Sequence, residues 1–268
     1  GNICITIDDA EFTHLSLLMD NIFGYTNFEG IVPIRINPSG RPTEKGFALT
    51  HEYAIFYGHS QSSGISKIPR TDDQIKRFKE FDGIGRFEWR NLRREGSNSD
   101  RADGARQYYP IYADLDSGKV RVPLMHWNES DRSWTALESS KNNEVTVYPV
   151  NDAGIEKNWR WSEENVRSDY SNFIARTPAN GTPQIYYKYR ENEDGTTPLT
   201  LWTDKKYSAT EYGTKWLKDL FGNSPFSYPK SVHAVHECLS VMGMKSTGSM
   251  KVIDYFAGSG TTAHAVIS

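Results

Sequence analysis

The residues best able to do chemistry lie in a glycine-containing turn near the end of the sequence. Residues 252–256 are apolar and predict a short strand, residues 257–260 (Ala-Gly-Ser-Gly) predict a tight turn, and a helix is expected from Thr261. Glycine adopts positive φ and lets a ligand approach the backbone, while the free N–H groups of a helix start favour ligands with negative charge or lone pairs. A nucleotide-like cofactor fits such a turn.

A Gly-x-Gly turn alone is a weak indication of ligand binding, because many such turns only pack a helix on a strand. Two kinds of ligand are disfavoured by the residues themselves. No lysine follows the second glycine, as a phosphate-binding loop requires, and the third glycine of a dinucleotide-binding fingerprint is missing.

Residues 254–262 (Asp-Tyr-Phe-Ala-Gly-Ser-Gly-Thr-Thr) resemble motif I of the amino-methylating DNA methyltransferases. The resemblance is to the permuted beta class, in which the catalytic motif comes first, and especially to the modification (Mod) subunits of type III restriction-modification systems. It covers nearly the whole chain. Residues 5–11, 37–41 and 50–53 are similar to stretches after the catalytic motif, and residues 201–204, 213–214, 220–222 and 226–231 to the segment that leads through motif X into motif I.

The resemblance implies that the cofactor is S-adenosyl-L-methionine, bound between motif X and motif I, and that the methyl acceptor is an exocyclic amino group, usually the N6 amino group of adenine. It implies no metal ion. For Lys230 the alternative is an ordinary solvated lysine at a helix start. The implied cofactor-binding residues are Asp254, Phe256, Ala257, Gly258, Ser259, Gly260, Thr261 and Thr262 of motif I, with Pro229, Lys230 and Ser231 of motif X.

The catalytic Asp-Pro-Pro-Tyr motif of that family, or a variant of it, is absent from the sequence. In the permuted order this motif belongs upstream of Gly1. We therefore expect the sequence to be a fragment that cannot methylate DNA alone, and its catalytic residues stay unassigned. A base amino nitrogen is a poor nucleophile inside a stacked pair, so the missing site must bind a base that has been flipped out.

The pattern of elements predicts an α/β protein with a strand-rich α+β insertion. The resemblance implies that both ends of the chain form part of a Rossmann-like methyltransferase core and that the insertion recognises the DNA target. We expect a core segment at 1–67, a target-recognition insertion at 68–200 and a cofactor-binding segment at 201–268. The predicted strands are 2–7, 31–36, 53–57, 108–113, 119–124, 145–150 and 185–189, and the predicted helices begin after an acidic cap at 8–11, at Thr71 and at residues 214 and 231.

The insertion is the best candidate for a DNA-reading surface, because arginine and asparagine can bind base edges and phosphates. The alternative is a solvated loop in which Glu88, Glu95, Asp100 and Asp103 neutralise the arginines. Trp159 and Trp161 are expected in the core and not on a base-stacking surface. The candidate DNA-binding residues are Arg86, Arg90, Arg93, Arg94, Asn98, Arg101 and Arg106.

Composition sets broad limits on these hypotheses. The net charge of -3 and the pI near 6.2 give no global signal for a polyanionic partner, so any contact with double-stranded DNA must be local. Cys4 and Cys238 have no metal-ligand spacing and predict buried free thiols in a prokaryotic cytoplasm. No segment is apolar for long enough to predict a membrane span.

Three alternatives stay open from the sequence. The parent protein could methylate the N4 amino group of cytosine, because both activities share the cofactor loop. The chain could also be a DNA-binding or assembly module without catalysis. A homodimer and a helicase-nuclease restriction subunit as partner are implied only by analogy with type III systems, and an orphan methyltransferase would have the same layout.

Overall fold

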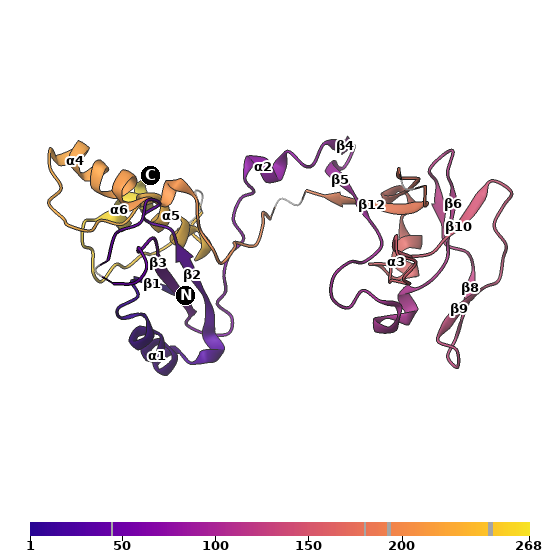
Figure 1. Cartoon of the computed structure of the whole chain (residues 1–268), viewed down its shortest axis with the longest axis horizontal. Coiled ribbons are helices and arrows are strands. Elements are labelled where there is room, and N and C mark those ends of the chain that lie inside the picture. The colour runs from indigo at the N-terminus through magenta and orange to yellow at the C-terminus, as the bar shows by residue number, and fades with distance from the viewer. Residues whose placement is uncertain (44, 180, 192–193, 246–248) are drawn as a thin grey trace. The chain divides into compact units, whose positions relative to one another are not determined.

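The computed structural model describes residues 1–268 except residues 44, 180, 192–193 and 246–248. The chain divides into two compact units (Figure 1). The first unit combines Gly1–Arg70 with Glu193–Ser268, and the second unit is Thr71–Asn192. The boundaries expected from the sequence were at 67/68 and 200/201.

The first unit is built on an antiparallel sheet of three strands in the order β1-β3-β2. The strands are β1 (Asn2–Ile7), β2 (Phe28–Ile34) and β3 (Glu52–Gly58). The strands predicted at 2–7, 31–36 and 53–57 are therefore confirmed, and β2 and β3 pair as a hairpin with a long connection. The chain is a mixed α/β protein, but the pairing of these strands does not show a parallel, Rossmann-like sheet. The only parallel bridge in the described residues of this unit joins Ile34 to Trp202.

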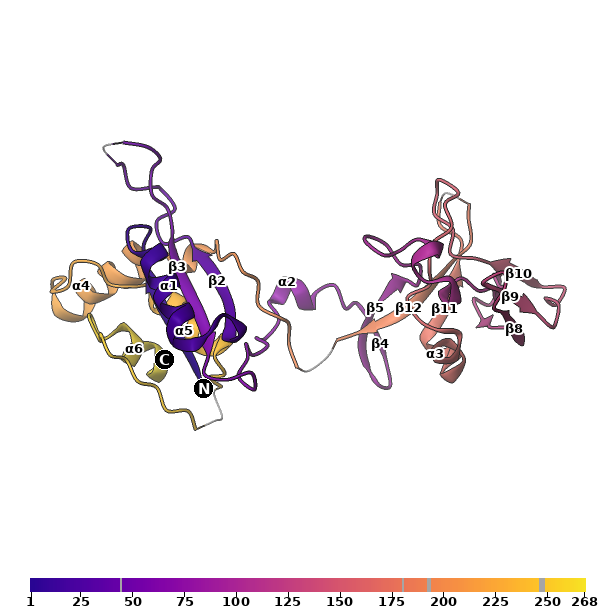
Figure 2. The ribbon, with the colours of Figure 1, turned by 90° about the horizontal axis from the view of Figure 1, so that it is seen from below.

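Helices cover both faces of this sheet because side chains alternate along the central strand β3. Ile55 and Tyr57 pack under α1 (Phe12–Phe23) through Met19. Ala54 and Phe56 point to the other face, where they join the cluster that contains Cys238 of α5 (Val232–Val241). Figure 2 shows α1 and α5 around the strands of this sheet.

The predicted helix after residues 8–11 is confirmed, but the acidic residues do not cap it as predicted. Its N-cap is Glu11, whose side chain makes no capping hydrogen bond, while the Asp8 carboxylate accepts a hydrogen bond from the Ala10 N–H at 3.1 Å. At the other end Gly24 has φ +79° and ψ 139°, which is not the left-handed conformation that commonly ends a helix. The residue has positive φ but an extended ψ, and it directs the chain into β2.

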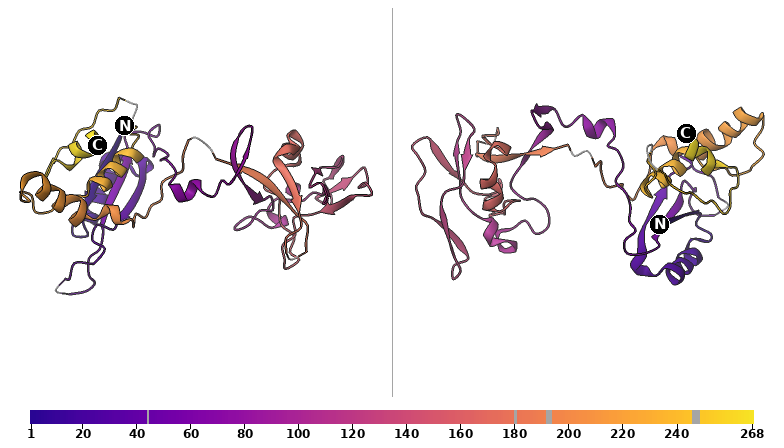
Figure 3. Two further views of the ribbon diagram at one scale, coloured as in Figure 1. Left: turned by 90° about the horizontal axis from the view of Figure 1, so that it is seen from above. Right: turned by 180° about the vertical axis from the view of Figure 1, so that it is seen from behind.

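The last part of the first unit is helical, as predicted. A π-helical turn, Thr210–Thr214, continues into α4 (Lys215–Phe221), which ends at the left-handed Gly222. Ser231 caps α5 by accepting a hydrogen bond from the Ala234 N–H, and α6 (Thr261–Ile267) follows the glycine turn. Figure 3 shows these orange and yellow helices together beside the strands.

The predicted strand at 252–256 is wrong. These residues form no strand, and Tyr255 and Phe256 are 90% and 91% exposed. A strand exists only where its N–H and C=O groups pair with a neighbour, and no described strand lies beside this segment. An apolar pattern without a pairing partner therefore did not produce a strand.

Two segments connect the first unit to the second, and they are paired with each other where they leave it. Ile68 and Thr196 form an antiparallel bridge, with N···O distances of 3.0 and 2.8 Å. Gly195, at φ +87°, lies so close that a Cβ there would be 2.2 Å from the Ile68 carbonyl oxygen. The exit and return of the chain are thus fixed side by side.

The second unit is rich in short antiparallel strands, which confirms the strand-rich texture predicted for this part of the chain. Its four-stranded sheet has the order β11-β12-β5-β4, a three-stranded sheet has the order β10-β6-β7, and β8 pairs with β9. The strands are β4 (Glu80–Asp82), β5 (Gly85–Asn91), β6 (Ile111–Asp114), β7 (Val120–Arg121), β8 (Met125–Asn128), β9 (Ser133–Ala136), β10 (Glu144–Val147), β11 (Phe173–Arg176) and β12 (Gln184–Arg190), with helices α2 (Asp72–Ile75) and α3 (Glu163–Ser168).

The helix predicted from Thr71 forms only one turn. Thr71 and Gln74 make a capping box, but α2 ends at Ile75, and Phe81 belongs to strand β4. The competing signal is the turn after β4, where the Asp82 carboxylate accepts hydrogen bonds from the N–H groups of Ile84 and Gly85. Turn chemistry therefore ended a helix that spacing alone would have extended.

The core of the second unit surrounds Trp159, which is fully buried, as expected. Its Nε1–H donates to the Tyr109 carbonyl oxygen at 2.8 Å, so the only polar atom of the side chain is satisfied. Trp161 packs at the edge of the same cluster against Phe173 and Tyr187.

In the described residues both cysteines are free, with Cys238 buried and Cys4 half-buried. No described helix combines the length and apolarity needed to cross a bilayer.

Replacing Trp159 by alanine should destabilise the second unit by about 3–5 kcal/mol, because a fully buried ring would leave a cavity and an unpaired carbonyl. Chemical denaturation followed by circular dichroism measures this loss. Leu124→Ala is the control, because Leu124 is exposed and its truncation should change stability by less than about 0.5 kcal/mol. Equal effects of the two changes would contradict the assigned core.

Candidate functional site

The glycine turn before α6 has the backbone geometry that its sequence predicted. Gly258 and Gly260 have φ of +52° and +76°, in the left-handed region that favours glycine. The Gly260 N–H donates to the Ala257 carbonyl at 2.7 Å and closes the turn. Ser259 and Thr261 join their hydroxyl groups at 2.7 Å. The turn is therefore fixed by local hydrogen bonds.

The segment before the turn is open on one side and anchored on the other. The Asp254 carboxylate accepts a hydrogen bond from the Phe256 N–H at 3.1 Å, but both side chains are exposed. Val252, in contrast, packs on the apolar cluster made by Val232, Leu239 and Ala265. This cluster joins α5 to α6, so the helices hold the turn while Asp254 and Phe256 face outward.

The residues predicted as motif X lie where the chain enters α5. Ser231 is fully buried, and its hydroxyl donates to the Lys206 carbonyl at 2.8 Å. Lys230 is not the solvated lysine of the alternative interpretation, because its ammonium pairs with the Glu52 carboxylate of β3. Gly213 approaches this segment so closely that a Cβ would lie 2.8 Å from the carbonyl oxygens of Pro229 and Lys230. Only glycine fits there.

The structure brings the motif X segment and the glycine turn together. The Phe226 ring lies against Gly258, and a Cβ at residue 258 would be 3.3 Å from the Phe226 Cζ atom. Beside Gly260, by contrast, an added Cβ would meet nothing within 4 Å. A turn with one glycine against a ring and the other next to open space fits a cofactor that contacts the backbone. In the described residues no cluster of His, Cys, Asp or Glu is arranged to hold a metal ion.

Four aromatic side chains beside this turn were not identified from the sequence. The His264 ring of α6 lies 5.1 Å from the Trp216 ring of α4, and Trp216 also contacts His233 of α5 at 5.5 Å. Tyr212 packs edge-on against His233 at 4.7 Å. Residues this far apart in sequence carry no shared spacing signal. The cluster connects all three helices around the glycine turn.

Burial, together with the nearby Lys206 ammonium, lowers the pKa of His233 below its ordinary value. The unfolded chain therefore takes up this proton at a higher pH than the folded chain does. The sign follows directly: the free energy of unfolding falls as the pH drops below the ordinary histidine pKa of 6.5.

Replacing His233 by phenylalanine keeps a ring between Tyr212 and Trp216 but removes the titrating group. We expect the variant to lose less stability than the parent between about pH 7 and pH 5, measured by thermal unfolding at fixed ionic strength. His14→Gln is the control because His14 is exposed. An unchanged pH dependence in the His233 variant would show that this histidine does not carry the effect.

The candidate DNA-binding residues of the second unit differ in exposure, and one of them is buried. Arg93 is only 9% exposed, and its guanidinium donates to the Val150 carbonyl at 2.7 Å and pairs with Glu95 at 3.2 Å. This arginine has a structural role. Within the part of the chain that is described, Arg86 and Arg94 form no ion pair.

The other candidates are neutralised to different degrees. Arg101 pairs with Glu156 at 2.9 Å, and Arg106 pairs with Glu129 at 3.2 Å. Arg90 pairs with Glu88 at 2.6 Å. Of the four predicted acidic partners, Glu88 and Glu95 do pair with arginines, whereas Asp100 pairs with Lys157 and Asp103 caps a short 3-10 helix. Asn98 is exposed and adopts φ +56°.

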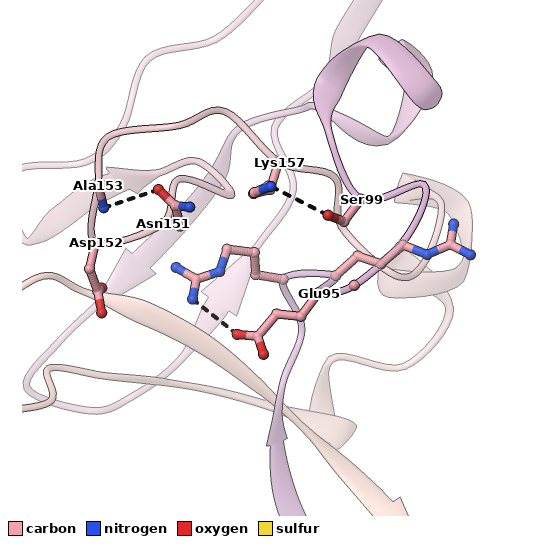
Figure 4. Close-up of a pocket in the computed structure, with 9 residues that line it drawn as sticks. Glu95, Ser99, Asn151, Asp152, Ala153 and Lys157 are labelled. Carbon is pink, nitrogen blue, oxygen red and sulfur yellow. Dashed lines mark hydrogen bonds and ion pairs between the residues drawn. The ribbon is translucent and has the colours of Figure 1, made fainter.

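A pocket of about 420 Å³ lies beside the loop that carries Arg93 and Arg94 (Figure 4). Lys157 donates to the Ser99 hydroxyl at 3.4 Å, and the Asn151 side chain accepts from the Ala153 N–H at 3.1 Å. The acidic groups of Glu95 and Asp152 also line it. The lining holds three cations, Arg93, Arg94 and Lys157, but Arg93 pairs with Glu95 and Lys157 pairs with Asp100, so most of its charged groups are used within the protein.

Comparison with known proteins identifies the class to which this fold and this turn belong. The sequence model of the N6/N4 DNA methylase family matches residues 1–268, so the chain belongs to that family. Members of this family use S-adenosylmethionine.

The chain is 32% identical over 269 residues to the type II methyltransferase M.KpnI of Klebsiella pneumoniae, a match that covers 99% of this chain and 58% of that protein. It is 30% identical to the EcoPI Mod subunit, a type III restriction-modification enzyme of Escherichia phage P1, covering 99% of this chain and 39% of that protein. The StyLTI Mod subunit of Salmonella typhimurium is 26% identical and matched over 35% of its length. The chain thus spans between about one third and three fifths of these relatives.

Proposed function

We propose that residues 1–268 are the cofactor-binding and DNA-reading part of a site-specific DNA methyltransferase that acts on the N6 amino group of adenine. The first support is the family match over the whole chain. The observation that carries the proposal is the contact of Phe226 with Gly258, because it joins motif X to motif I in one place. Double-stranded DNA is the proposed substrate, and the prokaryotic cytoplasm is the proposed location.

The first unit would bind S-adenosylmethionine, which supplies an electrophilic methyl group when bound. Gly258 and Gly260 would leave the backbone accessible, and Ser259, Thr261 and Thr262 would offer hydroxyl groups at its edge. Asp254, Phe256 and Ala257 complete the proposed motif I. Pro229, Lys230 and Ser231 would contribute mainly by position, since Lys230 pairs with Glu52 and Ser231 is buried.

The second unit would read DNA. Six candidates from the sequence have exposed or half-exposed side chains: Arg86, Arg90, Arg94, Asn98, Arg101 and Arg106. Three of these, Arg90, Arg101 and Arg106, pair with a carboxylate. Arg93 would support the surface from below. The chain contains no Asp-Pro-Pro-Tyr motif, so we propose that residues 1–268 do not transfer methyl groups by themselves.

The protein could belong to either of two kinds of methylation system. The Mod relatives favour a type III restriction-modification system, with a homodimer and a restriction subunit as proposed partners. The M.KpnI relative favours a type II methyltransferase, because that match is the more identical and covers more of the relative. A restriction subunit that copurifies with the full-length protein would support the first candidate, and an active protein without one would support the second.

The experiment that tests the activity uses the full-length protein, unmethylated genomic DNA and S-adenosylmethionine with a labelled methyl group. Digestion to nucleosides should yield labelled N6-methyladenine. If the label is found in N4-methylcytosine instead, the methyl acceptor is cytosine and not adenine. If no label is transferred and calorimetry detects no cofactor binding, the chain is a DNA-binding or assembly module and the proposal is wrong.

Replacing Gly258 by alanine should weaken S-adenosylmethionine binding by about tenfold or more. The alanine must adopt positive φ, and its Cβ must displace the Phe226 ring. Gly222→Ala is a matched control: it has φ +75°, meets nothing within 4 Å and lies at the end of α4. Both changes strain the backbone, but only the first should alter the dissociation constant measured by calorimetry. Equal losses would mean that the turn does not contact the cofactor.

A further inference from the structure

Two arginines at one end of the four-stranded sheet share a single carboxylate. The Glu88 carboxylate of β5 lies 2.6 Å from the Nε atom of Arg90 and 3.5 Å from the Nε atom of Arg77. The cluster therefore keeps one uncompensated positive charge. Arg86, two residues before Glu88 on the same face of β5, is exposed and forms no ion pair among the described residues.

An aromatic ring fixes the position of both guanidinium groups. Tyr189 of β12 is paired across the sheet with Glu88. The Arg90 Cζ atom lies 3.5 Å from the centroid of the Tyr189 ring, and the Arg77 Cζ atom lies 5.8 Å from it. The buried Phe78 ring stacks behind Tyr189 at 6.0 Å. We call Arg77, Glu88, Arg90 and Tyr189 the Tyr189 cluster.

The Tyr189 cluster presents unused hydrogen-bond donors to solvent. Both arginines contact Glu88 through Nε, and in the described part of the chain their terminal Nη groups donate to no acceptor. The side chains of Arg77 and Arg90 are 41% and 37% exposed. A guanidinium that is held against a ring loses little further freedom when it binds an anion.

Other arginines of the second unit also lie over aromatic rings: Arg190 shares the Asp82 carboxylate with Lys188, and others have a carboxylate of their own. Arg101 lies over Tyr108 and pairs with Glu156, and Arg106 lies over Trp127 and pairs with Glu129. Thr71–Asn192 contains 19 basic and 20 acidic residues, so the unit as a whole has no positive excess. The excess at Glu88 is therefore local.

We propose that the Tyr189 cluster is a binding site for a phosphate group of the DNA backbone. Guanidinium groups bind phosphate oxygens through paired N–H donors, and here two such groups converge above one ring. Phosphate contacts fix the position of a protein on the duplex, while base contacts select the sequence. Arg77 and Arg90 thus position the second unit on DNA. This inference rests on the proposed DNA-reading function of that unit.

The test measures binding of the full-length protein to a fluorescent duplex of mixed sequence over a series of salt concentrations. Arg77→Gln combined with Arg90→Gln should weaken binding by about tenfold or more at low salt and reduce the slope of log K against log salt by about one to two. Arg121→Gln is the matched control, since it removes an arginine that lies over the Tyr112 ring and has its own carboxylates in Glu138 and Glu144, and it should change neither value.

A further variant separates positioning from charge. Tyr189→Leu removes no charge, so a purely electrostatic patch would bind DNA as before. If the ring holds the guanidinium groups in place, affinity should fall several-fold while the salt slope changes little. Thermal unfolding of each variant verifies that it is folded.

Three outcomes overturn the assignment in distinguishable ways. If the parent binds DNA and the double arginine variant binds it equally well, the Tyr189 cluster is not a DNA contact and the proposed function stands. If titration with inorganic phosphate shows that the double variant loses phosphate binding while its duplex binding is unchanged, the site takes free phosphate and not DNA. If the parent binds no duplex at any salt concentration, the proposed DNA-reading function fails and this inference fails with it.

Discussion

The contact between α5 and α6 is the constraint on which the candidate cofactor site depends. Val232 and Leu239 of α5 bury Ala265 of α6, and this small apolar cluster places the glycine turn next to the segment that enters α5. Without it, Gly258 would have no fixed relation to Phe226, and the two motifs would be separate pieces of sequence. The polar anchors at the start of α5, the buried Ser231 and the Lys230–Glu52 pair, tie the same region to the sheet.

Local chemistry decided which parts of the fold could be predicted from the sequence. The capping box at Thr71 and the alternation in β1 and β3 act over a few residues, so the sequence contains the whole signal. The segment 252–256 failed because a strand needs a partner and a hydrophobic run does not say whether one exists. In the site, the glycine turn was predictable because its residues are contiguous, whereas the aromatic cluster of Tyr212, Trp216, His233 and His264 was not.

In the second unit, the arginines that are close in sequence do not all belong to one exposed surface. Alternation along β5 places Arg86, Glu88 and Arg90 on one face, but Arg93 follows the strand and is buried against Val150. Neighbours in sequence therefore have opposite roles. Arg77 and Tyr189, which complete the Tyr189 cluster, come from other elements and have no unusual sequence context. Whether a cluster of side chains can bind an anion depends on the number of cations and carboxylates that lie close together in the folded protein.

The bridge between Ile68 and Thr196 has a consequence for how such a chain can diversify. Because the outgoing and returning segments are hydrogen-bonded to each other, the 122 residues of Thr71–Asn192 begin and end at adjacent points on a fixed base. The path of the polypeptide through the first unit does not depend on what is inserted between them. A different insertion can therefore occupy the same position in evolution while the first unit is inherited unchanged.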